Sequence, residues 1–352
     1  MAKATEIEGL DCAAPVLSEI KRTALVRFEE MRALREVALD FSDAEGVHDM
    51  RVATRRLRGL LRDGKPYFVK SISPKKLKAI ADALGAVRDA DVAVAALEKL
   101  AAHKNAEITH GLALFADAHR TRRARVREQL QHAISEKTLT VLREEFIAQL
   151  ERATKITPGK QARKSAKANR STSFREASRE IVFARFAELQ DESRSLYRPF
   201  STTPLHHLRI AAKRLRYAIE LCAQCYGKSL AHFAQDISKL QTHLGELHDC
   251  DVWIAELGSL LAARQSKHDG AKENASNPNP RVAEEQTAAA AVWLLRYFIK
   301  ERTKHYRDAL ALWHSLETDN FHARLATEFA QFNQAFIIQP INLSPADVAD
   351  NG

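Results

Sequence analysis

Two related stretches decide the fold of this chain. The first is Val47-His48-Asp49-Met50-Arg51-Val52-Ala53-Thr54-Arg55-Arg56-Leu57-Arg58. The second is Leu205-His206-His207-Leu208-Arg209-Ile210-Ala211-Ala212-Lys213-Arg214-Leu215-Arg216. Most aligned positions are identical or exchange like for like, so the repetition predicts an internally duplicated chain.

Both stretches have the periodicity of an amphipathic α-helix. At about 100° per residue, the basic side chains of the first stretch project within an arc of about 80°, opposite the apolar ones. The first basic face comprises His48, Arg51, Arg55, Arg58 and Arg62, and the second comprises His206, Arg209, Lys213 and Arg216. Like charges at i,i+4 repel, so a solvated face usually mixes acids with bases. The first face has no acid, which indicates an anion-binding site.

Residues before each stretch predict where its helix begins. Thr203 precedes Pro204 as an N-cap precedes a proline at the first helical position. Ser42 and Glu45 have the spacing of a capping box. His206 and His48 are therefore expected near a helix N-terminus, where free N–H groups and the helix dipole favour an anion.

The composition predicts an all-α protein with a polyanionic partner. The 352 residues include only 12 Gly and 10 Pro, 45% are hydrophobic, and the formal net charge is +9 with a pI of about 9.4. This charge favours nucleic acid, a membrane surface or a phosphate polymer as partner. No apolar run is long enough to span a membrane, the first residues lack a signal-peptide pattern, and the four cysteines form no framework. We therefore expect a cytoplasmic location.

Amphipathic periodicity and composition divide the chain into a duplicated helical domain with short ends. We expect a lead-in over 1–15, a first repeat over about 16–155, a basic linker over 156–173, a second repeat over about 174–335 and a flexible tail over 336–352. The two repeats are expected to form a single domain of antiparallel helical bundles.

A second repeated signature supports the duplication. Leu84-Gly85-Ala86-Val87-Arg88-Asp89-Ala90-Asp91-Val92 matches Leu244-Gly245-Glu246-Leu247-His248-Asp249-Cys250-Asp251-Val252. Asp89 and Asp249 could orient basic side chains or bind a divalent metal, and the surrounding cations favour the orienting role. Arg88 and Lys239 are further candidates for lining the anion site.

The paired motifs closely resemble the CHAD family, named for conserved histidines in an α-helical domain. The resemblance covers about 15–335 and implies two pseudo-symmetric helical bundles around a basic central cavity. It also implies binding of inorganic polyphosphate, with no established catalysis by the domain itself and no cofactor. By match, the phosphate-contacting role falls to His48, Arg51, Arg55, Arg58, His206, Arg209, Lys213 and Arg216. We expect a stand-alone CHAD protein, with attachment to polyphosphate granules as one compatible role.

Three other functions remain open from the residues alone. Nucleic acid is disfavoured because the basic faces carry almost no aromatic side chains for stacking, and Tyr217 alone flanks one of them. A metal-dependent enzyme acting on phosphate chains would use Asp89, Asp91, Asp249 and Asp251 as ligands. Cys222-x-x-Cys225 with Cys250 and His248 is a weak zinc motif. No membrane binding is expected, since no helix has a suitable apolar face.

Overall fold

The computed structural model describes residues 6–102, 106–155, 172–270 and 278–337. Their regular secondary structure is helical, and the only β-type pairing among them is an isolated bridge between Pro15 and Ser173. The all-α prediction is confirmed. None of the described helices is both long and apolar enough to cross a membrane.

The helices follow the order expected for two successive sets. Those of the first set are α1 (Val16–Ala33), α2 (Arg35–Leu39), α3 (Ala44–Asp63), α4 (Lys75–Ala101), α5 (Ala106–Ala133) and α6 (Glu136–Thr154). Those of the second are α8 (Phe174–Ser193), η1 (Arg194–Tyr197), α9 (Thr202–Tyr226), η2 (Lys228–Leu230), α10 (Ala231–Gly270), α11 (Pro278–Thr318) and α12 (Phe321–Ile337). Most of the predicted linker, 156–171, and most of the predicted tail, 338–352, lie outside the described residues.

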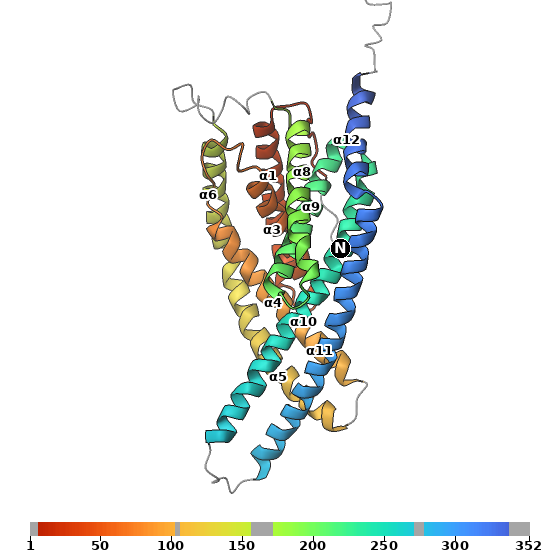
Figure 1. Cartoon of the computed structure of the whole chain (residues 1–352). Coiled ribbons are helices and arrows are strands. Elements are labelled where there is room, and N and C mark those ends of the chain that lie inside the picture. The colour runs from red at the N-terminus through yellow and green to blue at the C-terminus, as the bar shows by residue number, and fades with distance from the viewer. Residues whose placement is uncertain (1–5, 103–105, 156–171, 271–277, 338–352) are drawn as a thin grey trace, which may run out of the picture.

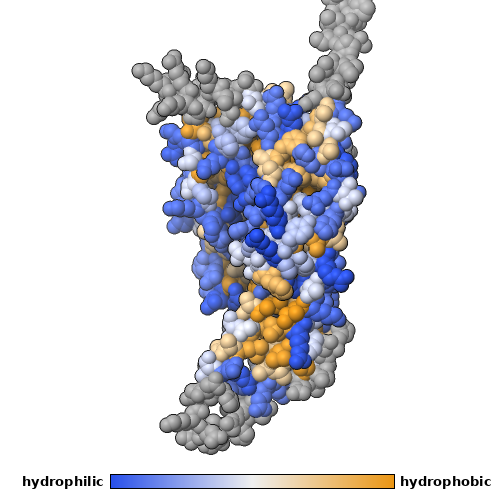
Figure 2. Space-filling view, viewed as in Figure 1, coloured by the Kyte–Doolittle hydropathy of each residue, from blue (hydrophilic) through white to orange (hydrophobic). Residues whose placement is uncertain are grey.

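The molecule is an elongated bundle that continues into an arm (Figure 1). The bundle contains α1, α3, α6, α8, α9 and α12, and the far ends of α4, α5, α10 and α11 form the arm. One apolar core runs through both sets of helices and includes Phe28, Leu57, Leu215 and Phe233. A smaller core fills the arm. Figure 2 shows hydrophilic residues gathered over the bundle and apolar ones over part of the arm.

The basic helices α3 and α9 are positioned by their apolar sides. Met50 and Leu57 on α3, like Leu208 and Leu215 on α9, are fully buried in the main core. Burying side chains of this size stabilises a fold by about 1.5–3 kcal/mol each. Because one side of each helix is fixed in the core, its basic side is turned outward from that core.

The helix starts differ in detail from those predicted. Asp43, not Ser42, caps α3 by accepting the Glu45 N–H, while the Ser42 hydroxyl binds Asp40. α9 begins at Thr202 after Ser201, so Thr203 lies inside the first turn. Both corrections leave the histidines in equivalent places, because His48 and His206 are each the fifth residue of their helix.

A disulfide fastens the N-terminal segment to the end of α9. Cys12 and Cys225 are bonded, with Cα atoms 5.5 Å apart and a sequence separation of 213, whereas Cys222 and Cys250 are free and buried. The N–H groups of Phe174 and Arg175 donate to the carbonyls of Ala14 and Cys12. The expectation that the cysteines form no framework is therefore wrong for Cys12 and Cys225, and Cys225 is not available for a zinc motif. The lead-in over residues 6–15 is fastened to α9 and to the start of α8.

Replacing Cys12 by serine should lower the free energy of unfolding by about 2–5 kcal/mol, because the bond closes a very long loop in the unfolded chain. Urea denaturation with and without a reductant measures the loss. Cys225→Ser should match it, and reductant should then have no further effect. Titration of all four thiols in the denatured, unreduced wild-type protein would contradict the bond.

Candidate anion-binding site

A cavity of about 1250 Å³ lies between α3, α9 and the segment that follows α3. The described residues that line it include eight basic side chains, which are Arg55, Arg58, Arg62, Lys65, Lys70, Arg152, Lys213 and Arg214. No aspartate or glutamate is among the described lining residues. Part of each predicted basic face therefore meets the other at one hollow.

Another large hollow has the opposite character. It measures about 910 Å³ and is lined largely by apolar side chains of the first set of helices, such as Leu25 and Ile147. Its charged residues include Glu29, Glu30 and Asp49 as well as two arginines. Carboxylates at this hollow disfavour an anion, so the basic cavity is the better candidate.

Arg51 and Arg209 occupy matching positions beside the second repeated signature. A Cβ atom added at Gly85 would lie 3.8 Å from the Arg51 Nε, and one added at Gly245 would lie 3.8 Å from the Arg209 Nε. Each glycine thus faces the guanidinium of the paired basic helix. The atoms nearest to each added Cβ belong to the arginine side chain and not to the backbone of another helix. The glycines therefore leave space beside the arginines, and close approach of two helix backbones does not require them.

The cations of the two basic faces are close enough to perturb one another. Desolvation, followed by the charge of Arg55, lowers the pKa of Arg51 to about 10, and Arg209 acts in the same direction. The pKa of Arg209 is lowered by desolvation and, against the opposing effect of Asp249, by Arg55. Residues from both repeats therefore share one electrostatic environment.

Lys213 shows the largest effect of this crowding. Desolvation and the charges of Arg209, Arg55 and Arg51 lower its pKa to about 6, and Asp249 offsets only part of the shift. An amine with this pKa is mostly neutral at pH 7.5. No carboxylate of a described residue lies within ion-pair distance of Lys213, Arg55 or Arg209. The site therefore holds basic groups whose charge is only partly compensated.

Asp89 and Asp249 are the acids of this environment. The Asp89 Oδ1 lies 3.6 Å from a terminal nitrogen of Arg51. Desolvation raises the pKa of Asp249 against the influence of Arg209, and the charge of Asp89 raises it further. Both carboxylates act on the arginines of the two repeats, which is the geometry expected of groups that orient the basic side chains.

The two histidines have different partners. The Nδ1 atoms of His206 and His248 lie 3.2 Å apart. Desolvation and His248 lower the pKa of His206 to about 4. Burial and the charge of Arg88 lower the pKa of His48, and the Arg88 guanidinium lies 3.6 Å from Glu45. Arg88 thus lies beside His48, and His248 lies beside His206. Arg88 and His248 are the aligned residues of the two repeated signatures, so the two histidines have corresponding neighbours.

Comparison with known proteins identifies the family. The CHAD domain profile matches residues 24–258, well over half of the chain. This protein belongs to the CHAD domain family. It is 29% identical over 229 residues to the uncharacterized protein Rv2226 of Mycobacterium tuberculosis, a match that covers 62% of this chain and 40% of that protein. The chain thus spans about two fifths of the length of this relative.

Solved structures share the CHAD fold at low sequence identity. The crystal structure of the CHAD domain from the plant Ricinus communis has a TM-score of 0.64 and 21% identity, covering 89% of this chain and 95% of that one. PptA from Streptomyces chartreusis has a TM-score of 0.55 and 15% identity, covering 86% and 100%. These likenesses support the fold of the two sets of helices.

Four of the predicted site residues of this CHAD protein line the cavity, and they are Arg55, Arg58, Arg62 and Lys213. The other residues predicted to bind the anion are not among its lining, and they are His48, Arg51, Arg88, His206, Arg209, Arg216 and Lys239. Arg51 and Arg209 still act on Lys213 through their charges, but Arg216 and Lys239 are engaged elsewhere.

Arg216 is 4% exposed and is held by Glu220 at 3.4 Å and by the Ser238 hydroxyl at 3.3 Å. Glu220 follows Arg216 by four residues and aligns with Arg62 of the first repeat, so it ends the second basic face. Lys239 is exposed and pairs with Asp236 at 3.0 Å, about 180° around α10 from His248.

Of the first basic face, Arg62 lines the cavity but also binds Asp63, with its Nε 2.9 Å from the Oδ1. Arg58 has no such pair within the described chain, and desolvation lowers its pKa. Sequence reasoning missed four basic lining residues, which are Lys65, Lys70, Arg152 and Arg214, as well as the role of Glu220. Only Glu220 had a sequence signal, its i,i+4 spacing to Arg216.

Asp91 and Asp251 are anchored by arginines in a way that argues against metal binding. Arg127 of α5 donates to Asp91 at 2.7 Å, and Arg302 of α11 donates to Asp251 at 2.5 Å. Both carboxylates are nearly buried. These ion pairs fasten α4 to α5 and α10 to α11. Two of the four aspartates that a metal site would use are therefore already bound by arginines.

Replacing Lys213 by methionine should change how stability depends on pH. The unfolded chain binds a proton at Lys213 up to its usual pKa near 10.5, while the folded state releases it above about 6. Wild-type stability should therefore rise with pH through this window. Between pH 6.5 and 8.5 the wild type should gain about 1 kcal/mol or more relative to the variant, measured by urea denaturation. Parallel pH profiles would contradict this.

Proposed function

We propose that this protein binds inorganic polyphosphate in the basic cavity between α3 and α9 and on Arg51 and Arg209, whose charges act on Lys213 of the cavity wall. The observation that carries the proposal is a hollow of about 1250 Å³ lined by eight basic side chains and by no carboxylate of a described residue. A protein that gathers desolvated cations in this way loses stability unless an anion compensates them. Membership of the CHAD family supports a phosphate-chain ligand.

The spacing of the basic groups suits a linear phosphate chain. Residues at i,i+3 and i,i+4 of a helix lie about 5–6 Å apart, so Arg51, Arg55 and Arg58 present a row of donors along α3. Guanidinium groups bind phosphate oxygens through paired N–H donors. Lys213 and Arg209 extend the contacts from α9, so one chain could be bound from both sides.

Nucleic acid fits the site less well. Single strands are usually bound by stacking their bases on aromatic rings. The cavity includes Phe68 and Tyr217, but the Arg216 guanidinium already lies over the Tyr217 ring, 4.8 Å from its centroid. Polyphosphate has no bases and needs no such platform.

We also propose that the protein binds the phosphate chain without cleaving it. Two of the four aspartates that a metal-dependent reaction would use, Asp91 and Asp251, are bound by arginines. Asp89 and Asp249 remain among cations, where they orient the ligand-binding side chains. In a cell that accumulates polyphosphate granules, binding of this kind would hold the protein on them.

The double change Arg51→Glu with Arg209→Glu should reduce polyphosphate affinity at least about 100-fold, because two charge-assisted contacts are lost. Titration calorimetry with a defined chain length measures the affinity. Wild-type binding should weaken steeply as salt rises, and the variant should show a smaller salt dependence.

The paired change Lys137→Glu with Lys304→Glu alters the net charge equally at exposed positions outside the cavity. It should change affinity only slightly, about threefold or less, because exposed charges are screened. Arg51→Gln with Arg209→Gln provides a milder variant, and thermal unfolding checks that each protein is folded.

Near-normal affinity in both Arg51/Arg209 pairs would refute the proposed site. Displacement of polyphosphate by duplex DNA or RNA at equal phosphate concentration would favour nucleic acid instead.

Binding should take up protons. Lys213, with a pKa of about 6, is mostly neutral at pH 8, and a bound phosphate chain would raise that pKa and favour the ammonium form. Affinity should therefore fall as pH rises from 6 to 9. Calorimetry in two buffers of different ionisation enthalpy should detect up to about one proton at pH 8. The Lys213→Arg variant should still bind polyphosphate, but residue 213 should no longer take up a proton on binding, because arginine stays charged. Unchanged proton uptake in that variant would contradict the assignment.

A further inference from the structure

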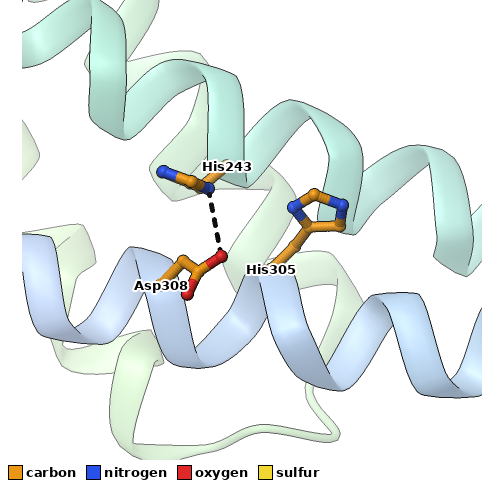
Figure 3. Close-up of side chains that lie close together, drawn as sticks. All are labelled: His243, His305 and Asp308. Carbon is orange, nitrogen blue, oxygen red and sulfur yellow. Dashed lines mark ion pairs between the residues drawn. The ribbon is translucent and has the colours of Figure 1, made fainter.

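A second cluster of chemically active side chains lies outside the anion site, where α10 packs on α11 (Figure 3). His243 comes from α10, and His305 and Asp308 come from α11, three residues apart on one face. One ring nitrogen from each histidine and one carboxylate oxygen all lie within 4.8 Å of one another. None of the three residues has a part in the anion site described above.

The polar atoms of this cluster lack ordinary partners. The Nδ1 atoms of both histidines are buried and form no hydrogen bond within the described chain. The His243 Nδ1 lies 3.7 Å from the Asp308 Oδ2, which is too long for a hydrogen bond. Buried polar atoms are nearly always paired, so two unpaired imidazole nitrogens beside a carboxylate call for a further group.

The second nitrogen of His305 has a suitable outer partner. Its Nε2 lies 4.0 Å from the Glu301 carboxylate, one helical turn earlier. His305 turns one ring nitrogen toward the other two side chains and the other nitrogen away (Figure 3). A carboxylate behind a ligating histidine is the usual arrangement at zinc sites, where it fixes the ring orientation.

We propose that His243, His305 and Asp308 form a binding site for a transition-metal ion of the zinc class, which fastens α10 to α11. With metal–nitrogen and metal–oxygen distances of about 2.0–2.2 Å, two ligands of one tetrahedral ion lie about 3.3 Å apart. The 3.7 Å separation is close to this value, and small side-chain rotations complete the approach. Two imidazoles with one carboxylate favour such an ion over Mg²⁺ or Ca²⁺.

The cluster is accessible to an ion from solvent. All three side chains are partly exposed. Three protein ligands with a water in the fourth position satisfy tetrahedral zinc. Because the ligands come from two helices, a bound ion would tie them together and raise the stability of the folded state.

Zinc binding to untagged, metal-free protein tests the proposal, with no polyphosphate present because phosphate chains chelate zinc themselves. A competing chromophoric chelator measures affinity. His305→Gln and Asp308→Asn should each weaken zinc binding about 100-fold or more, and Glu301→Gln should weaken it about 10-fold. His132→Gln, at an exposed histidine of α5, should leave it unchanged. Zinc should raise the thermal unfolding temperature of the wild type and of His132→Gln equally, that of Glu301→Gln by less, and that of His305→Gln and Asp308→Asn least.

X-ray absorption of the bound zinc identifies its ligands. The proposal requires two imidazoles and no sulfur. Glu45, His48 and Asp49 form another cluster of potential ligands near the first basic face, and an ion held there would show one imidazole. Zinc that binds with unchanged affinity in His305→Gln, a single-imidazole spectrum, or no binding to the wild type would each overturn the assignment.

Discussion

Mutual repulsion among desolvated cations is the constraint on which the central site depends. Arg51 and Arg209 approach from different repeats, and both lower the pKa of Lys213. The nearby carboxylates of Asp89 and Asp249 compensate only part of this charge. Apolar burial of α3 and α9 supplies the opposing free energy, since each helix inserts fully buried side chains into the common core. The packing of α3 and α9 thus keeps these cations closer together than their mutual repulsion alone would allow.

The same positions in each repeat rigidify the surroundings of the site. Asp91 is bound by Arg127 and Asp251 by Arg302, and each of these acids lies two residues beyond the acid that faces the basic groups. Along α4, as along α10, one aspartate therefore faces the arginine of a basic helix and the next ties down the following helix. This division of roles gives two of the four aspartates a structural role, because arginines of the following helices already bind them.

Sequence reasoning predicted the helical class, the two basic helices and their apolar sides, because a 3.6-residue period decides which side chains are buried. It counted Arg216 in the second basic face, but the carboxylate of Glu220, four residues later, holds that arginine in the interior. Lys239 was expected to line the anion site, but it is exposed and pairs with Asp236. The face of α10 on which it lies depends on the packing of that helix. The His206–His248 contact and the Cys12–Cys225 bond join residues that are far apart in the sequence. Local periodicity carries no information about such contacts.

The bond between Cys12 and Cys225 orders events during synthesis. The ribosome makes the chain from its N-terminus, so α1 to α6 are complete while Cys225 has not yet been translated. Cys12 must keep its thiol, or exchange with other thiols, until α9 has emerged. Every nascent chain that stops within the first repeat therefore has a Cys12 without its native partner. Formation of the native disulfide marks a polypeptide that has been translated through nearly all of the second basic helix.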